Sequence, residues 1–296
     1  MATREVAEVP AAAATVPLEV RIGFAHASVQ WIADRCGADL LHVKGAALDP
    51  TLVPDRGFSD ADVLVRPSHV ARVLAELPRH GWELINSFAY GSSFEHSATL
   101  RHSDFGLLDL HRIFPGAGPT PEKAFATLWS ERRTMTLGGW PCAVPALGAQ
   151  AALLLLHAAR GGTDPKAARD IGFVWTRATD EERAQVLEWV ERLDAALGFS
   201  VITGELDRHR DDPAYDLWRV AAEGGTRMEE WRARVRAARG LRAKALVAGR
   251  SVLVNVEHLT ILRGRPVTRR EVVGEFFDRP LRGLREQLAR RRRRNE

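Results

Sequence analysis

Residues 42–65 read HVKGAALDPTLVPDRGFSDADVLV, and this stretch decides the fold. Its last part sets Asp60 and Asp62 two residues apart at the start of the apolar run Ala61–Val65, which predicts a buried strand. Side chains alternate along a strand, so both carboxylates leave the same face of the sheet. A lone pair of this kind also occurs where a strand simply ends at the surface, so the motif needs support from the rest of the chain.

The segment before the pair has its own signals. A short apolar run over 38–43 predicts a strand that ends at Lys44-Gly45. Gly45 allows the backbone to approach a phosphate closely. Residues 49–57 contain two prolines and a glycine, which predicts a loop with a helical turn before it.

A third carboxylate, Asp109, stands between leucines in GLLDLH, residues 106–111. Burying a carboxylate without a partner is costly, so Asp109 is not easily explained as an ordinary core position. If its strand lies beside that of Asp60 and Asp62, three carboxylates meet. Hard oxygen ligands favour Mg²⁺ or Mn²⁺. Three carboxylates on neighbouring strands are what two-metal phosphoryl or nucleotidyl transfer requires.

Working outward, the pattern divides the chain into a strand-rich part and a helical part. A helix is expected over Leu18–Cys36, a helix after Pro67, a strand over Gly81–Phe88, and a hairpin of Phe94–Leu100 with Gly106–Ile113 that turns at residues 102–104. Residues 114–120 are rich in proline and glycine and predict a linker. Short strands near 133–137 and 141–144 follow. Helices are then expected at Ala146–Arg160, Pro165–Thr176, Asp180–Leu197, Pro213–Ala222, Arg227–Val247 and Arg270–Arg292.

Composition limits the classes of protein. In 296 residues, 45% are hydrophobic and 27% charged, as in folded soluble proteins, and two cysteines exclude a disulfide framework and a Cys-based zinc site. No apolar run approaches the roughly 20 residues of a membrane helix, and the N-terminus does not read as a signal peptide. We therefore expect a cytoplasmic protein with no membrane partner. The net charge of +4 owes much to the run Arg290–Arg294, a basic tail on a nearly neutral body that argues against a dedicated nucleic-acid surface.

The runs K-G-A-A-L (44–48), R-G-F-S-D-A-D-V-L-V (56–65) and L-L-D-L-H (107–111) together resemble the uncharacterised nucleotidyltransferase family of the polymerase-β-type superfamily. The resemblance covers residues 38–113, with a weaker continuation in LLLLH at 153–157 and Arg169-Asp170. It implies an α+β fold, with a mixed sheet flanked by helices and an all-helical C-terminal part. The implied domains are an α/β catalytic domain at 17–145 and a helical domain at 146–296 with the basic tail.

The resemblance also implies an activity. The protein would be a metal-dependent nucleotidyltransferase that moves an NMP from an NTP to a hydroxyl or phosphate acceptor and releases pyrophosphate. Asp60 and Asp62 would ligate both Mg²⁺ (or Mn²⁺) ions, and Asp109 would bind the catalytic metal and help deprotonate the acceptor. The wider superfamily opens with Gly-Ser, where this chain has Gly45-Ala46, so Lys44 or Arg56 would have to supply the contact of the missing hydroxyl.

Each of the other candidate residues has more than one interpretation. Lys44, Gly45, Arg56 and Ser59 are expected to bind the triphosphate, but Lys44 or Arg56 in a surface salt bridge, or Ser59 shaping the turn, would also fit the sequence. His111 shares the face of Asp109 and either holds it, contacts substrate or is a core histidine. His157, at the end of an apolar helix, is a structural cap or a substrate contact. Lys166 and Asp170 are four apart on one helix, where they pair with each other or contact phosphate or acceptor.

Two other functions remain open on the sequence. One is a non-catalytic nucleotide- or partner-binding protein on a degenerate nucleotidyltransferase scaffold. The other is an RNA-end-modifying, toxin-like transferase that uses the arginine tail. The acceptor itself, whether a small molecule, a peptide or RNA, is not determined by the sequence.

Overall fold

The structure is a computed structural model that describes residues 16–252, 265, 267–275 and 278. The Arg290–Arg294 run lies outside these residues, as does most of the helix expected from Arg270. Residues 269–275 and 278, at the start of that helix, are helical. Among the described residues, no helix combines the length and the apolar character that crossing a membrane requires.

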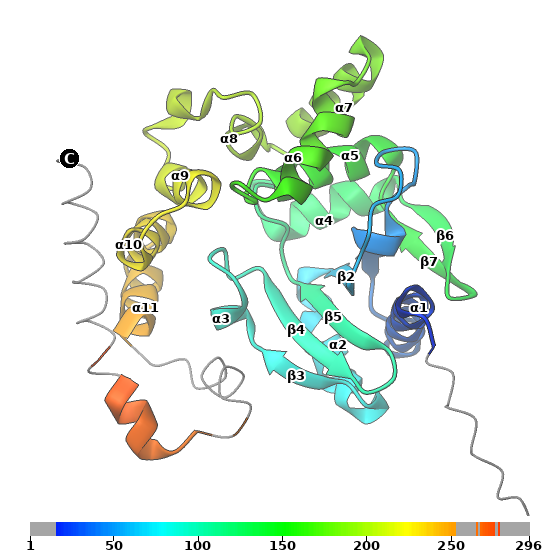
Figure 1. Cartoon of the computed structure of the whole chain (residues 1–296), viewed down its shortest axis with the longest axis horizontal. Helices are drawn as coiled ribbons and strands as arrows, with labels where there is room; N and C mark the ends of the chain where they lie inside the picture. Colours follow the sequence, from blue (N-terminus) through cyan, green and yellow to red (C-terminus); the bar gives the residue numbers. More distant parts are fainter. Residues whose placement is uncertain (1–15, 253–264, 266, 276–277, 279–296) are drawn as a thin grey trace, which may run out of the picture.

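A five-stranded mixed sheet lies at the centre of the fold (Figure 1). Its strands are β1 (Leu40–His42), β2 (Asp60–Val65), β3 (Glu83–Asn86), β4 (Ser97–His102) and β5 (Gly106–His111). Their spatial order is β1-β2-β5-β4-β3, in which β2 and β5 are parallel and the other neighbouring pairs antiparallel. The strand that carries Asp60 and Asp62 is therefore hydrogen-bonded directly to the strand that carries Asp109.

One face of the sheet is covered by α1 (Leu18–Cys36) and α2 (Val70–Glu76). Alternate residues of β2, namely Ala61, Val63 and Val65, pack with the buried side of α1 in one apolar cluster. Burial of these side chains stabilises the fold by roughly 25 cal/mol for each Å² of apolar surface removed from water. This face is covered by α1, whose His26 and Gln30 also hydrogen-bond to the buried His42 of β1.

The opposite face carries Asp60, Asp62 and, further along β2, the buried Leu64. Leu64 belongs to a second apolar cluster, to which four α-helices contribute: α4 (Pro121–Ser130), α5 (Leu147–Ala158), α7 (Asp180–Arg192) and α8 (Ala196–Phe199). Nearly every position of α5 is buried, as expected of a helix that is apolar all round. This cluster joins strand residues to helices beyond residue 145, while the division into domains at 145/146 stays a prediction.

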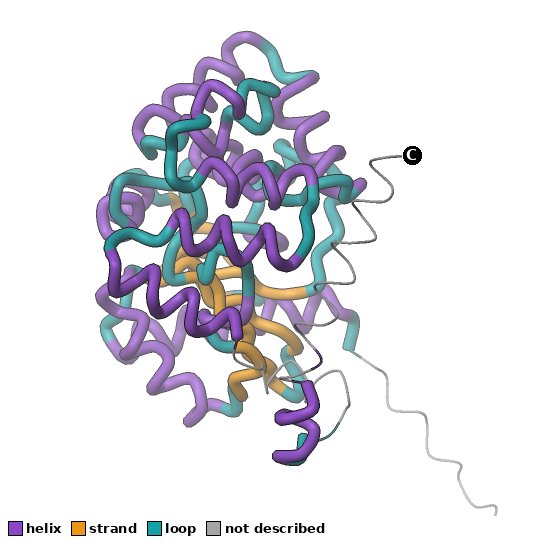
Figure 2. Tube along the Cα trace, turned by 90° about the vertical axis from the view of Figure 1, so that its left-hand side faces the viewer, coloured by secondary structure: helices purple, strands orange, loops and turns teal. Residues whose placement is uncertain are grey.

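The other elements surround this core. A second hairpin, β6 (Arg133–Leu137) with β7 (Trp140–Val144), packs against α1 and β1. In Figure 2 the strands lie in the lower part of the molecule, and the part above them consists of helices and loops. The remaining described helices are α3 (Phe88–Gly91), α6 (Pro165–Ile171) with a π-helical turn at Gly172–Thr176, α9 (Tyr215–Glu223), α10 (Arg227–Ala237) and α11 (Leu241–Val252), and short 3-10 turns lie at Gly45–Ala47, Pro67–His69, Leu77–His80 and Leu206–His209.

The last helices are tied back to the sheet by ion pairs. The Glu95 carboxylate, just before β4, accepts hydrogen bonds from Arg234 of α10 at 2.8 Å and from Arg250 of α11 at 3.0 Å. Ser93 donates to Glu230 of α10 at 2.7 Å. Helices α9, α10 and α11, on the left of Figure 1, therefore belong to the same folded body as the sheet.

The predicted α+β class, with helices flanking a mixed sheet and a helical C-terminal part, is confirmed. The first helix has the predicted bounds. Several predicted bounds were wrong. The helix expected over Arg227–Val247 is two, because Ala238 is extended and Gly240 has a φ of 85°. The helix expected to reach Leu197 stops at Arg192, and Asp194 takes a φ of 45°.

The strand expected over Gly81–Phe88 is Glu83–Asn86, which ends before α3 begins. The hairpin strand expected over Phe94–Leu100 is Ser97–His102. The helix α4 was missed altogether. It begins with a cap in which the Thr120 side chain accepts a hydrogen bond from the backbone of Lys123, followed by Pro121 in the first turn. Both features are favourable at a helix start.

Candidate active site

Register brings the carboxylates together. In the parallel pair of β2 and β5, Asp62 lies directly opposite Asp109, and Asp60 opposite Leu107. Because side chains alternate, Asp60, Asp62, Asp109 and His111 all leave the face that α5 covers. Asp109 therefore lies beside the Asp60 and Asp62 pair, an arrangement that the sequence could only assume.

Asp62 is the buried centre of the group. A single oxygen, Oδ1, accepts from Lys44 Nζ at 2.6 Å and from His111 Nε2 at 2.9 Å. Burial raises the pKa of the Asp62 carboxyl, but the Lys44 ammonium and the His111 hydrogen bond outweigh it and hold the pKa well below its usual range. Asp62 is thus ionised, and its second oxygen has no protein partner among the described residues.

His111 is a neutral donor to this carboxylate. Burial, followed by the Lys44 charge, lowers the pKa of His111 to about 4. The ring donates from Nε2 because the ionised carboxylate can only accept. Nδ1 is then a bare acceptor, buried and without a partner among the described residues. The interpretation in which His111 holds Asp109 is wrong, because the ring donates to Asp62 instead.

Asp109 and Asp60 are charged less easily. Burial and the neighbouring Asp62 raise the pKa of Asp109 to about 6, although Thr99 of β4 donates to its Oδ1 at 2.7 Å. Burial and Asp62 also raise the pKa of Asp60. Ser59 donates to Asp60 Oδ1 at 3.3 Å, at the exposed start of β2. Asp60 and Asp109 resist ionisation beside the charged Asp62. A cation bound among the three carboxylates would therefore lower the free energy of their ionised state.

The donor chemistry fits a divalent cation. Asp62, Asp109 and His111 each offer a ligand atom, and these atoms all lie within 4.8 Å of one another. Carboxylate oxygens suit Mg²⁺ or Mn²⁺. The sequence predicted Asp60 as the third member of this group, whereas the closest set contains His111, with Asp60 two residues further toward the start of β2.

Lys44 and Gly45 stand at the end of β1, next to the first residue of β2. Gly45 begins the 3-10 turn Gly45–Ala47 with a φ of 60°. A Cβ there would lie 3.3 Å from the Asp60 carbonyl oxygen, so the backbones approach more closely than a side chain easily allows. The sequence marked Gly45 as a position where the backbone could approach a phosphate. The packing of this turn against β2 favours glycine there in any case.

Arg56 and Asp170 differ from expectation. Arg56 Nε and Nη2 donate to the two oxygens of Asp170, each at 2.9 Å, and both side chains are buried. The pair of Lys166 with Asp170 was wrong, because the helix α6 turns Asp170 inward and leaves Lys166 exposed. Arg56 is in a salt bridge, as the alternative reading supposed, but in the interior and not on the surface.

Arg160 is a site residue that sequence reasoning missed. Its guanidinium, just after α5, lies 3.2 Å from His96 Nε2 and 3.3 Å from His157 Nδ1. The ring of His96 lies 5.1 Å from that of His111, centre to centre. Burial lowers the pKa of Arg160 to about 10 and is also the main cause of the lowered pKa of His96 and His157.

His157 accepts a hydrogen bond from Arg160. This contact does not decide between a structural cap and a substrate contact. Nothing local in the sequence marks Arg160 or His96. Thr99 could have been found from the predicted hairpin, because its place opposite Asp109 follows from the register of β4 with β5.

The sequence is similar to a family of known proteins. The sequence model of a family described as "Uncharacterised nucleotidyltransferase" matches residues 33–203, more than half of the chain. No curated protein matches the sequence.

The chain is similar, at low sequence identity, to solved structures that include the following three. An antigenic nucleotidyltransferase-like protein from Paracoccidioides brasiliensis shares 16% identity over 64% of this chain and 94% of its own, with a TM-score of 0.36. The antibiotic-resistance factor ANT(2'')-Ia shares 15% over 62% and 88%, with a TM-score of 0.34. The lincosamide antibiotic adenylyltransferase LnuA, bound to lincomycin, shares 13% over 57% and 93%, with a TM-score of 0.31.

Proposed function

The chain belongs to the family of uncharacterised nucleotidyltransferases, and we propose that it transfers a nucleoside monophosphate from an NTP to a hydroxyl or phosphate acceptor, releasing pyrophosphate. The observation that carries this proposal is the pairing of Asp62 with Asp109 across β2 and β5, with Asp60 on the same face. Family membership supports nucleotidyl transfer in general, and the carboxylates support the metal-dependent form of it.

Asp60, Asp62 and Asp109 would hold Mg²⁺ or Mn²⁺. A divalent cation at this position would neutralise charge on the transferred phosphoryl group. His111 and Lys44 keep Asp62 ionised and fix its Oδ1, so that Oδ2 is the oxygen left for a cation.

The chain's own residues have defined tasks in the transfer. The acceptor oxygen forms a bond to the α-phosphorus, and the bond from that phosphorus to the oxygen bridging to the β-phosphorus breaks, so pyrophosphate leaves. Where the acceptor is a hydroxyl, its proton goes to the Asp109 carboxylate. Such transfer leaves little covalent work for side chains, so positioning and charge neutralisation provide most of the catalysis.

The triphosphate would lie near the turn after β1. Lys44, the Gly45 backbone and Ser59 border the start of β2. Lys166 is close enough for its charge to oppose the raised pKa of Asp60, which supports a phosphate contact from α6. Arg56 already donates to both oxygens of Asp170, so its expected phosphate contact would be made from within that pair.

The test is transfer of label. The protein is incubated with each α-³²P-labelled NTP, Mg²⁺ or Mn²⁺, and total cell extract as the acceptor pool. We expect a labelled product from the wild type and none from the double variant Asp60→Asn/Asp62→Asn. Asp104→Asn, on the exposed turn between β4 and β5, is the matched control and should label as the wild type does.

Other outcomes would overturn the proposal or narrow it. Absence of label with every nucleotide, from protein that is folded by circular dichroism, would reject transfer and favour the non-catalytic binding scaffold. Label confined to the RNA fraction would instead identify the RNA-end-modifying transferase. Label in the double variant would show that the carboxylates are not the catalytic group.

A further inference from the structure

Arg160 is an enclosed cation that no carboxylate of the described residues pairs with. Its Nε donates to the Leu156 carbonyl at 3.4 Å, and its two Nη atoms donate to His96 and His157. Burial is the main cause that lowers the pKa of both histidines, so neither carries a charge at neutral pH. An enclosed charge without a counter-ion is costly, so this position favours an anion. We call Arg160, His96 and His157 the Arg160 group.

Other enclosed cations of this chain have a carboxylate of their own. The pairs are Lys44 with Asp62 at 2.6 Å, Arg56 with Asp170 at 2.9 Å, and Arg234 with Glu95 at 2.8 Å. Arg160 departs from this pattern within the part of the chain that the structure describes. A ligand is left to supply its counter-ion.

The Arg160 group has hydrogen-bond donors to spare. A guanidinium carries five N–H groups. Three of those of Arg160 have the acceptors given above, and the other two, both on Nη atoms, have none among the described residues. His157 accepts at Nδ1, so its ring proton is on Nε2, which also has no acceptor there. Both side chains are half-buried, so solutes can reach them.

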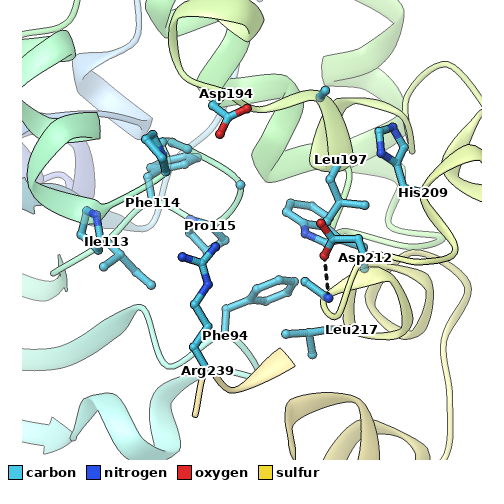
Figure 3. A pocket seen from close by; sticks show the side chains of 18 residues that line it. Phe94, Ile113, Phe114, Pro115, Asp194, Leu197, His209, Asp212, Leu217 and Arg239 are labelled. Carbon is cyan, nitrogen blue, oxygen red and sulfur yellow. Dashed lines mark hydrogen bonds between the residues drawn. The ribbon is translucent and has the colours of Figure 1, made fainter. Parts of the chain in front are cut away.

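Two aromatic rings form the back wall of this group. The Arg160 guanidinium lies 5.5 Å from the centre of the Phe94 ring and 5.9 Å from that of Phe114. Figure 3 shows the same two side chains in the wall of a neighbouring cavity of about 540 Å³, which Arg160 does not line. The rings therefore hold the guanidinium on one side, and its free donors are left for the side of the histidines.

The Arg160 group lies beyond the end of β5. The His96 carbonyl accepts a hydrogen bond from the Arg112 amide at 2.9 Å, one residue past that strand. The proposed triphosphate position is at the other end of the sheet, where Asp60 begins β2. Asp62 and Asp109 lie between the two ends. Arg112 is three residues beyond Asp109, which is about 10 Å along an extended strand.

The group is in contact with the carboxylate site. The ring of His96 lies 5.1 Å from that of His111, centre to centre, and His111 donates to Asp62 at 2.9 Å. Burial lowers the pKa of Arg160, and the charge of Asp62 opposes that change. An anion on Arg160 would therefore lie within reach of the same field as the catalytic carboxylates.

The direction of transfer connects this end of the sheet with the acceptor. In displacement at phosphorus, the attacking and leaving oxygens lie roughly in line on opposite sides of the phosphorus. Pyrophosphate would leave toward the turn after β1, next to Asp60. The acceptor would then enter from the opposite side, which is the side of the Arg160 group.

We propose that Arg160 and His157 bind an acid group, phosphate or carboxylate, of the acceptor, and that the acceptor is a small anionic molecule. A second oxygen of this molecule attacks the α-phosphorus, with the bonds made and broken as given above. This inference rests on the proposed function, since it names the class of molecule that receives the NMP. The enclosed position fits one acid group better than a polynucleotide, whose binding depends on many phosphate contacts.

Binding is tested first, without transfer, by ligand-observed NMR. Saturating Mg²⁺ tripolyphosphate occupies the triphosphate position. The probes are glycerol 3-phosphate, glycerate and glycerol, which separate a phosphate, a carboxylate and no acid group on one carbon chain. We expect both acids to bind and glycerol not to bind. Arg160→Gln should weaken both acids by about tenfold, the effect of losing one charge-assisted contact.

Two further variants keep the test independent of folding. Arg160→Lys keeps the charge but loses the planar fork, so it should weaken the acids by about threefold. Arg79→Gln, at an exposed position just after α2, is the matched control and should bind all probes as the wild type does. Binding of Mg²⁺ tripolyphosphate should be unchanged in every variant, which also shows that each is folded.

Several results would overturn the proposal. These are equal binding of glycerol and the acids, no binding of either acid, and acids that bind Arg160→Gln and Arg160→Lys as tightly as the wild type. Loss of tripolyphosphate binding by folded Arg160→Gln would assign Arg160 to the triphosphate and would equally reject an acceptor role.

The two proposals can fail separately. For the labelling assay, cell extract is first divided on an anion exchanger. The retained fraction should supply the acceptor, and Arg160→Gln should need about tenfold more of it for half-maximal label, at an unchanged requirement for NTP. Label from the unretained fraction alone, or in a macromolecule alone, rejects the small acid and keeps the transfer. Acid binding that depends on Arg160, without any label, rejects the transfer and keeps the anion site.

Discussion

Arg56 and Asp170, 114 residues apart in the sequence, form a buried two-point ion pair that fastens the loop before β2 to α6. The same loop is held a second time, by a hydrogen bond from Arg169 to the Pro54 carbonyl. The loop leads directly into Ser59 and Asp60. The position of the first carboxylate therefore depends on a helix from the distant half of the chain.

Removing one partner of this pair should lower the free energy of unfolding strongly, and removing both should cost less than the two single losses added together. Asp170→Asn or Arg56→Gln leaves one buried charge without its partner, which costs on the order of 3–5 kcal/mol of unfolding free energy. The double variant removes both charges and should cost less than the sum of the two single changes, by about 2 kcal/mol or more. Urea denaturation of all four proteins measures this. Additive losses would show that the two side chains do not act together.

Asp109→Asn should stabilise the metal-free protein at neutral pH. The pKa of Asp109 is about 6 in the folded state against about 3.9 unfolded, so the folded state binds more protons between these values. Stability of the wild type is therefore lost as pH rises through that window. Asn cannot ionise, so at pH 7.5 the variant should be more stable by on the order of 2 kcal/mol.

The comparison is made by thermal melts in chelator from pH 4 to 8. The advantage of Asp109→Asn should vanish near pH 4, and Asp104→Asn, on an exposed turn, should follow the wild type throughout. An advantage that persists unchanged at pH 4 would mean that ionisation of Asp109 is not its cause.

Lys44→Met should tighten binding of Mn²⁺ in the absence of nucleotide. The ammonium of Lys44 lies 2.6 Å from Asp62 and repels any cation held by the same carboxylate. Removing one unit charge at this range should increase affinity by at least about tenfold. Electron paramagnetic resonance of free Mn²⁺ gives the affinity directly.

Transfer by Lys44→Met should nevertheless fall, because the triphosphate loses a cation. Lys123→Met, at an exposed position of α4 outside the proposed site, is the comparison and should transfer at the wild-type rate. Weaker Mn²⁺ binding by Lys44→Met would show that Lys44 organises the site more than it competes with the metal.

Gly45→Ala should be more damaging than Gly139→Ala. Both glycines have a positive φ, of 60° and 81°, so both variants carry the backbone cost, about 1 kcal/mol. Only at Gly45 would the new Cβ also meet the Asp60 carbonyl, at 3.3 Å, whereas nothing lies within 4 Å at Gly139. The difference in unfolding midpoint isolates that contact, and equal midpoints would show that the Gly45 turn can shift to accommodate it.

The sequence by itself determined the elements whose signals are local. The apolar spacing of Leu18–Cys36 fixes α1, and strand alternation puts Asp60 and Asp62 on one face, because both depend only on the geometry of a few successive residues. The α4 helix was missed because its start follows a proline- and glycine-rich stretch that also fits a linker. The break at Ala238–Gly240 lies in a pattern whose periodicity continues across it.

Only the tertiary structure decided which residues meet. Asp62 and Asp109 are paired by the register of two parallel strands, and a shift of one residue would have turned one of the carboxylates to the other face. Asp170 pairs with Arg56 rather than with Lys166 because packing of α6 turns it inward. Arg160, His96 and the cavity beside Phe114 arise where loops and helices from both halves converge. Such contacts depend on how distant segments pack, and no run of neighbouring residues encodes that packing.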